Sequence, residues 1–416
     1  MSASSSRLLV LAVRTACSHT QRRYLLANTP VFAQLREYVT DPLSVSSRKA
    51  QVPSYKADRI SQDMGLNHRN LSAVATSLKD KSRYDIVDIG EVEENISKAR
   101  KCTGPRHFIV DPALAQLVAD HLQNDLADGK TFIFEYNPGP GVLTRTLLNS
   151  GAQRLVALES DRKFLPELEA LENSLYGQLE VVHCNFLTLD TFLDEPAIDS
   201  EKLFTDLGIS EVPWADDVPV KVVGLFYPST ESKRLWNLIY NLFQRHSIYR
   251  YGRVEIVMFM TEKLFTRLSS SPGEFMIYRD LTVLWQMACN IELLHKEPMS
   301  SFLAVNKTGK VSKCKTLTKN THMCLVRLTP RQGLFSGCLN PANSTALIML
   351  VRQCLVKRKA LLKDKLNAWS PNSGEKILNE LGIRSNILTG ELSQEDYKNL
   401  FQVMLQTNLF SHCWLD

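Results

Sequence analysis

The fold of this chain is decided by residues 130–144, Lys-Thr-Phe-Ile-Phe-Glu-Tyr-Asn-Pro-Gly-Pro-Gly-Val-Leu-Thr. Residues 132–134 form a short apolar run of strand length, and the Asn-Pro-Gly-Pro-Gly segment after it predicts a tight turn that leads into a helix. Glycine lets the backbone come close to a ligand because it carries no side chain. The stretch therefore predicts a ligand-binding loop between a buried strand and a helix.

Two residues of this stretch indicate which ligand the loop holds. A dinucleotide site would need a third glycine where Thr144 stands, and it would hold a pyrophosphate at the helix N-terminus. Glu135 ends the strand, and its carboxylate repels a phosphate but attracts a cationic group such as the ammonium of S-adenosylmethionine. A lone glycine loop also occurs as an ordinary α/β turn, so the other strand ends must support the assignment.

Three further strands end in residues that suit the same ligand. The second strand ends in Glu159, whose carboxylate can accept hydrogen bonds from both ribose hydroxyls. The third is followed by Asn185, and the fourth runs into Gly224-Leu-Phe-Tyr227. Because the carboxyl ends of parallel strands meet at one edge of a sheet, we expect these residues to converge on an adenosine-bearing ligand. The four strands are expected at residues 132–134, 154–158, 179–183 and 220–223.

The rest of the chain completes an α/β pattern and then changes to helices alone. Three more strands are expected at residues 253–260, 291–295 and 323–328, with helices at 231–245 and 278–289. From Asn340 onward only helical patterns occur, and Ser393 begins a capping signal. Residues 101–335 are therefore expected to form one domain, with an acidic insertion at 190–219, and residues 336–416 a second, helical domain.

Together these motifs resemble the ribosomal RNA adenine dimethyltransferases of the small subunit, over most of residues 101–416. The family's first motif is similar to Arg106-His-Phe-Ile-Val-Asp111, its cofactor loop to residues 135–144, and its ribose acid to Glu159. Its third-strand motif is similar to His183-Cys-Asn-Phe186, and its target-base loop, Asn-Leu-Pro-Tyr, to Gly224-Leu-Phe-Tyr227. The resemblance implies a seven-stranded, Rossmann-like S-adenosylmethionine-dependent methyltransferase sheet plus a small C-terminal all-α domain.

The resemblance also implies the ligands and the residues that bind them. The methyl donor would be S-adenosyl-L-methionine, and the acceptors would be the N6 atoms of two adjacent adenosines in a ribosomal hairpin. The catalytic residues would be those of the target-base loop, namely Gly224, Phe226 and Tyr227. The cofactor-binding residues would be Ile109, Glu135, Asn137, Gly139, Gly141, Glu159 and Asn185.

Three positions depart from the family's pattern. Asn137 replaces a glycine but tolerates a positive φ, and Asn185 replaces an aspartate and keeps an acceptor without its charge. Gly224 replaces the asparagine that holds the target amine, so we expect weakened methylation. Restoring asparagine at this position should raise methyl transfer. The backbone carbonyl of Phe226 could still accept one hydrogen of the amine, and Tyr227 could still stack on a flipped base.

Composition indicates the compartment. The first 36 residues hold five arginines and no acid, which predicts a mitochondrial transit peptide at residues 1–45, followed by a flexible arm at 46–100. The nine cysteines contain no C-x-x-C pair, so the sequence predicts neither a zinc site nor a disulfide framework. The expected location is the mitochondrial matrix.

Charge is distributed unevenly along the chain. Residues 298–363 contain twelve Lys or Arg and no acid, which favours phosphate contacts with RNA or DNA over a solvated basic face. Residues 190–217 carry nine acids and one lysine, and either repel nucleic acid from the pocket rim, touch a protein partner or form a simple connector. The expected nucleic-acid contacts are Lys307, Lys310, Lys313, Lys315, Lys319, Lys357, Arg358 and Lys359. The last three are expected to lie on a helix, because the apolar residues before them have helical spacing.

Two functions compete for this chain. The mitochondrial branch of the family is implied to act with the mitochondrial RNA polymerase in opening promoter DNA within the nucleoid. The altered Gly224 together with the retained basic stretch favours this role for a chain that is a monomer when free. The alternative is an active dimethyltransferase of mitochondrial small-subunit ribosomal RNA. A small-molecule methyltransferase would leave the basic stretch unexplained.

Overall fold

The computed structural model describes residues 106–190, 199–305 and 321–407, together with Glu94, Ile96, Ser97 and Ala99. The predicted transit peptide lies outside the described residues, as does the arm apart from those four residues. The predicted contacts Lys307, Lys310, Lys313, Lys315 and Lys319 lie outside them as well.

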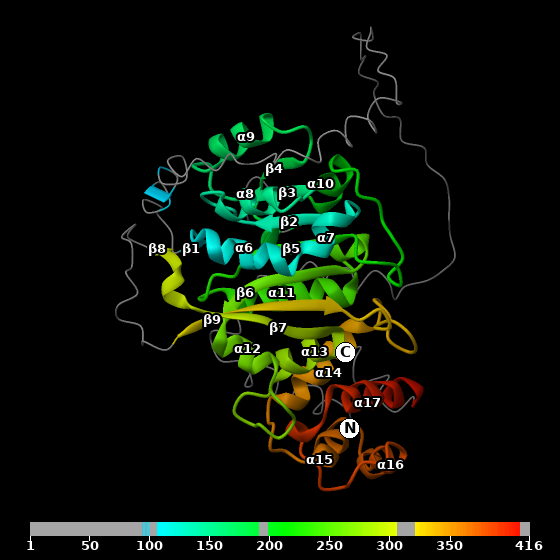
Figure 1. The fold of residues 1–416 in the computed structure, drawn as a ribbon. Coiled ribbons are helices and arrows are strands. Elements are labelled where there is room, and N and C mark those ends of the chain that lie inside the picture. Colours follow the sequence, from blue (N-terminus) through cyan, green and yellow to red (C-terminus); the bar gives the residue numbers. More distant parts are fainter. Residues whose placement is uncertain are drawn as a thin grey trace, which may run out of the picture. The chain divides into compact units, whose positions relative to one another are not determined.

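Seven strands form one mixed sheet in the order β4-β3-β2-β5-β6-β9-β7 (Figure 1). The pairs among β4, β3, β2, β5 and β6 are parallel, and β9 pairs antiparallel with both β6 and β7. The predicted seven-stranded sheet is thereby confirmed. The strands are β2 (Phe132–Tyr136), β3 (Leu155–Glu159), β4 (Leu179–His183), β5 (Val220–Leu225), β6 (Val254–Thr261), β7 (Cys289–Pro298) and β9 (His322–Pro330).

The central strands are mostly apolar and are buried along most of their length because helices cover both faces of the sheet. All five residues of β3 are buried, as are seven of the eight residues of β6. One face packs against α6 (Pro112–His121) and α8 (Val142–Asn149). The other face packs against α11 (Glu231–Gln244) and α13 (Asp280–Ala288).

Local signals set the starts of several helices. Asp111 caps α6, because its side chain accepts a hydrogen bond from the backbone amide of Ala113 at 2.9 Å, as the sequence predicts. The remaining helices of the sheet region are α7 (Gln123–Asp128), α9 (Leu165–Asn173), α10 (Ser200–Asp206) and α12 (Glu262–Leu268). Every helix that the structure describes is too short or too polar to cross a bilayer.

The C-terminal region is helical, as predicted, and comprises α14 (Ser344–Leu355), α15 (Leu362–Trp369), α16 (Ser373–Glu380) and α17 (Gln394–Gln406). Ser393 caps α17 with a capping box that includes Asp396. Apolar side chains of α14 and α17 belong to the same buried cluster as α11 and α13. The core is thus continuous across residue 336, and the division into two domains stays a prediction.

A second, two-stranded sheet was not predicted. It pairs β1 (Arg106–Ile109) antiparallel with β8 (Phe302–Val305), so that Arg106 faces Val305 and Ile109 faces Phe302. The two strands are almost 200 residues apart in the sequence, and each is four residues long. This pairing brings the first motif of the chain to the main sheet.

The described part of the acidic insertion packs as a connector. The Trp214 indole donates a hydrogen bond to the carbonyl of Arg331 at 3.0 Å, and Arg250 forms ion pairs with Glu201 and Glu211. Arg331 directly follows β9, which runs antiparallel to β6, so this contact lies at the edge of the sheet away from the carboxyl ends of the parallel strands. The described part of the insertion therefore does not line the pocket described below.

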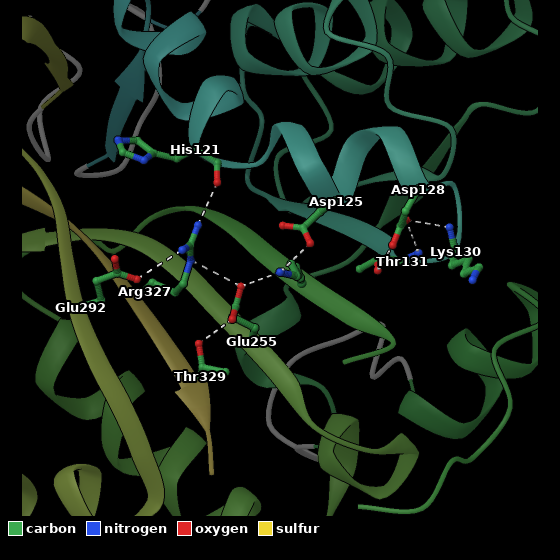
Figure 2. A network of polar contacts seen from close by, with 10 residues as sticks. His121, Asp125, Asp128, Lys130, Thr131, Glu255, Glu292, Arg327 and Thr329 are labelled. Atoms are coloured by element: carbon green, nitrogen blue, oxygen red, sulfur yellow. Dashed lines mark hydrogen bonds and ion pairs between the residues drawn. The ribbon is translucent and has the colours of Figure 1, made fainter. Parts of the chain in front are cut away.

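An ion-pair network lies at that same end of the sheet, away from the carboxyl ends of the parallel strands (Figure 2). The Lys221 ammonium on β5 lies 2.8 Å from Asp125 and 2.9 Å from Glu255. Arg327 on β9 pairs with Glu292 at 3.2 Å and donates to the carbonyl of His121 at 2.8 Å. The network links α6 and α7 to four strands of the sheet, at a place where Glu255 is only 4% exposed.

Candidate active site

A pocket lies where the carboxyl ends of β2 and β5 meet β1. Its lining includes residues from all three strands and from the loops that follow β2 and β5, among them Arg106, His107, Ile109, Glu135, Tyr136, Asn137, Gly224 and Tyr227. Of the predicted site residues, the structure thus brings Ile109, Glu135, Asn137, Gly224 and Tyr227 together in one cavity.

Glu135 is the buried acid of this pocket. The residue is 1% exposed, and its Oε2 atom has no hydrogen-bond partner. Burial raises the pKa of Glu135 to about 8, the Thr144 hydroxyl opposes this rise, and the charge of Glu159 adds to it. A buried carboxyl without a partner is costly, so this position suits a ligand that brings a hydrogen-bond donor or a cation.

Glu159 lies at the end of β3 with a side chain that is fully buried. One oxygen accepts hydrogen bonds from the Arg106 guanidinium at 2.9 Å and from the amide of Asp161 at 2.6 Å. The other accepts from the amide of Gly139 at 2.8 Å and from Arg106 at 3.2 Å. Glu159 thereby joins the glycine loop to β1, and Glu135 and Glu159 stand on adjacent strands.

The glycine loop adopts the backbone conformation that the sequence predicts. Asn137 has φ 52°, and its side-chain oxygen accepts a hydrogen bond from the Ser160 hydroxyl at 2.9 Å. Gly139 has φ 60°, and a Cβ there would lie 2.4 Å from the Phe108 ring. Gly141 has φ 78° and forms the N-cap of α8. The loop therefore requires glycine at Gly139 for space as well as for conformation.

The target-base loop presents one aromatic side chain to the pocket. Tyr227 lies against His107, with ring centroids 5.4 Å apart and an interplanar angle of 46°. Burial lowers the pKa of His107 to about 4, so its imidazole is neutral at physiological pH. Phe226 is fully buried in the core and lies outside the pocket lining, so its side chain is not available to a ligand. Gly224 forms part of the lining without a side chain.

The remaining predicted site residues lie outside the lining. Asn185 follows β4, and the neighbouring Cys184 amide donates a hydrogen bond to the carbonyl of Glu159 at 3.0 Å. The prediction that Lys357, Arg358 and Lys359 lie on a helix is wrong, because α14 ends at Leu355 and the three residues form the following turn. Arg358 donates a hydrogen bond to the carbonyl of Phe275 at 2.6 Å, which holds this turn against the loop before α13.

Sequence reasoning missed several residues of the pocket. Arg106, His107 and Tyr136 line it, and none was assigned a role from the sequence. The available signal was their position: Arg106 and His107 open the first motif, and Tyr136 stands between Glu135 and Asn137. The approach of Arg106 and His107 to the pocket depends on the pairing of β1 with β8, and this pairing has no local signature in the sequence.

Comparison with known proteins gives consistent matches. Residues 97–406 match the family described as ribosomal RNA adenine dimethylase. Dimethyladenosine transferase 2, mitochondrial, from Homo sapiens is 36% identical over 318 residues, which cover 74% of this chain and 80% of that protein. The protein of the same name from Bos taurus is 37% identical over 325 residues, with 76% and 81% coverage. A solved dimethyladenosine transferase from Plasmodium falciparum matches with a TM-score of 0.48 and 15% identity, covering 71% of this chain and 96% of that one.

Proposed function

Because the chain belongs to the ribosomal RNA adenine dimethylase family, we propose that it is a mitochondrial transcription initiation factor built on an S-adenosylmethionine-dependent methyltransferase fold. It works with the mitochondrial RNA polymerase in opening promoter DNA in the matrix nucleoid, and it retains weak adenine N6 methylation. The resemblance expected from the motifs is confirmed. The observation that carries the proposal is a pocket with the buried acid Glu135 and no side chain at Gly224, with Glu159 buried on the neighbouring strand.

The donor side of the pocket supports S-adenosylmethionine as the ligand. When bound, this cofactor supplies an electrophilic methyl group on a sulfonium. Glu135 would take its ammonium, because the Oε2 atom is buried without a partner. Glu159 would take the ribose hydroxyls, and the loop with Gly139 and Gly141 would bring its backbone close to the ligand. Asn137, Ile109 and Asn185 would complete the contacts.

The acceptor side supports only weak methyl transfer. An exocyclic amine needs a hydrogen-bond acceptor that orients it for attack, and Gly224 has no side chain to supply one. The carbonyl of Phe226 would accept one hydrogen of the amine, and Tyr227 would stack on the base. These two groups give a site that positions adenine less firmly than an asparagine would.

Nucleic acid would lie on a basic surface that includes the helical domain, residues 336–416. Lys357 and Lys359 are exposed, and they follow α14 in a turn that faces solvent. Lysine contacts to phosphate give affinity without sequence specificity, which suits a factor that holds melted strands. Arg358 would act mainly by holding this turn in place, through its bond to Phe275. The lysines between residues 306 and 320, which lie outside the described residues, would add further phosphate contacts.

The alternative function is an active dimethyltransferase that modifies two adjacent adenosines in mitochondrial small-subunit ribosomal RNA. The retained pair of buried acids and the glycine loop favour it, because a chain without methylation has no need of an intact donor site. The names of the relatives also favour a methyltransferase.

One paired experiment separates the two functions. Run-off transcription from a mitochondrial promoter is measured with the polymerase, with and without this chain, beside methyl transfer to a ribosomal hairpin. We expect strong stimulation of transcription and slow methylation. Glu135→Gln serves as the matched control, since it keeps the side-chain shape but removes the carboxyl that would pair with the ammonium of the donor, so methylation should fall while stimulation persists. Rapid methylation without stimulation would favour the alternative.

A further inference from the structure

The carboxylate of Glu159 is already occupied by groups of this chain. It accepts four hydrogen bonds, two from Arg106 and one each from the amides of Gly139 and Asp161. An ionised carboxylate offers about four lone-pair sites, so these donors use its accepting capacity. The two hydroxyls of a ribose could therefore bind only if one of the donors withdrew.

Arg106 is the donor that can withdraw. The amide of Gly139 belongs to a loop whose positive φ and contact with Phe108 hold it in place, and the amide of Asp161 lies two residues from Glu159 in the same loop. Arg106, in contrast, reaches Glu159 with a long, flexible side chain. That side chain is 17% exposed, so it reaches solvent while Glu159 does not.

The surroundings offer the guanidinium a second position. Its other nitrogen lies 3.6 Å from the Asp161 carboxylate, which is 26% exposed. The guanidinium carbon also lies 4.9 Å from the centroid of the Phe108 ring and 5.5 Å from that of Phe164. A shift toward Asp161 would keep a charge partner and one aromatic face while it released Glu159.

The strand that carries Arg106 is not part of the main ladder. β1 pairs with β8 alone in a sheet of two strands. Phe108 and Val305 pack in a small apolar cluster, whereas Ile109 and Phe302 pack into the larger core of the main sheet. A movement of the Arg106 side chain would therefore break no backbone hydrogen bond of the seven-stranded sheet.

We propose that Arg106 is an internal competitor at the nucleoside site: its guanidinium binds the Glu159 carboxylate where the ribose diol of an adenosyl ligand would bind, and it lowers the affinity of the site for that ligand. This inference rests on the donor side of the proposed function. It assigns Arg106 to setting cofactor affinity.

The test is calorimetric titration with S-adenosylhomocysteine. Arg106→Gln should bind about tenfold more tightly than the unaltered chain, since the ligand no longer displaces a charge-assisted pair. Arg106→Lys should show a smaller gain in affinity, because an ammonium cannot form the same paired contact. This second variant keeps the test valid if the glutamine variant does not fold. Arg162→Gln, the loss of an exposed arginine three residues from Glu159, is the matched control and should leave affinity unchanged.

A double-mutant cycle with Glu159→Gln separates competition from a general structural effect. The gain from Arg106→Gln should disappear when Glu159 is already neutral, because the ion pair that competes with the diol is then absent from both chains. If the unaltered chain binds and Arg106→Gln binds equally or more weakly, Arg106 does not compete and the inference is overturned. Absence of binding by the unaltered chain and by both Arg106 variants would overturn the donor site itself, and the inference with it.

Discussion

Gly224 on β5 lies beside Tyr136 on β2, and a Cβ added to Gly224 would lie 2.8 Å from the Tyr136 carbonyl oxygen. Gly224 also has φ 153°, which side-chain-bearing residues rarely adopt. The obstacle is backbone within a parallel ladder, so it cannot move aside as a flexible side chain would. This relationship changes what is expected from restoring the family's asparagine at this position.

We predict that Gly224→Asn does not raise methyl transfer, although the sequence alone suggested a gain. The new side chain would force β5 away from β2, and Gly224→Ala should lower the free energy of unfolding by about 2 kcal/mol for the same reason. Urea denaturation measures the cost. Gly177→Ala is the control for backbone conformation alone, since Gly177 has φ 73° with open space around it, and it should cost about 1 kcal/mol. Increased methylation by a stable Gly224→Asn chain would contradict this prediction.

Replacing Lys221 should destabilise the fold through the network of Figure 2. Lys221→Met would remove the ammonium that lies 2.9 Å from Glu255 and leave that carboxylate short of positive charge. We expect a loss of about 3 kcal/mol in the free energy of unfolding, because breaking one side of a buried pair leaves an uncompensated charge. Denaturant titration measures it.

An exposed ion pair provides the comparison for Lys221. Lys363→Met breaks the contact with Glu375, whose side chain is 64% exposed, and should cost less than about 1 kcal/mol. The double variant Lys221→Met with Glu255→Gln should recover part of the loss. Equal costs for the Lys221 and Lys363 variants would mean that burial of the network contributes nothing.

Glu135 should make stability depend on pH. Its pKa is about 8 in the folded chain, against an ordinary value of 4.5, so between these values the folded state binds more protons than the unfolded state. The stabilisation from this group is therefore complete below about pH 4.5 and is lost as pH rises toward 8. Glu135→Gln lacks this loss, so its stability relative to the unaltered chain should rise by up to about 1.4 kcal/mol per pH unit across that window.

Thermal and denaturant unfolding at several pH values would measure this difference. Glu169→Gln, which replaces an exposed carboxyl on α9, is the matched control for the removal of one carboxyl. A constant difference between Glu135→Gln and the unaltered chain from pH 5 to 8 would mean that Glu135 ionises normally in the folded state.

Charge reversal at Lys357 and Lys359 should weaken nucleic-acid binding without disturbing the fold. Arg358 is left in place, because its hydrogen bond to Phe275 supports the turn. Lys357→Glu with Lys359→Glu should reduce the slope of log affinity against log salt by about 2, one for each phosphate that the chain no longer neutralises. Fluorescence anisotropy on single-stranded and duplex DNA measures the slope. The reversal of Lys130 and Lys202, two exposed lysines outside residues 336–416, has the same net charge and should leave the slope nearly unchanged.

Much of the main sheet could be predicted because its signals are local. The apolar runs that end in Glu135 and Glu159 are short, continuous and followed by turn residues, so the strand ends were located within three residues. The cap at Asp111 and the positive φ at Asn137 depend on neighbouring backbone alone. The position of Lys357 was misjudged because the apolar spacing of α14 shows where a helix packs but not the residue at which it ends.

Local patterns in the chain show which residues end the strands. Because parallel strands bring their carboxyl ends together, these patterns also show that two acids and a glycine loop gather at that edge of the sheet. Two features depend on the three-dimensional packing alone. The Arg106 guanidinium binds the Glu159 carboxylate, 53 residues away, and Gly224 has no room for a side chain beside Tyr136. Both depend on where separate segments lie in space. That placement results from the packing of the whole core and has no signature in any short stretch of the chain.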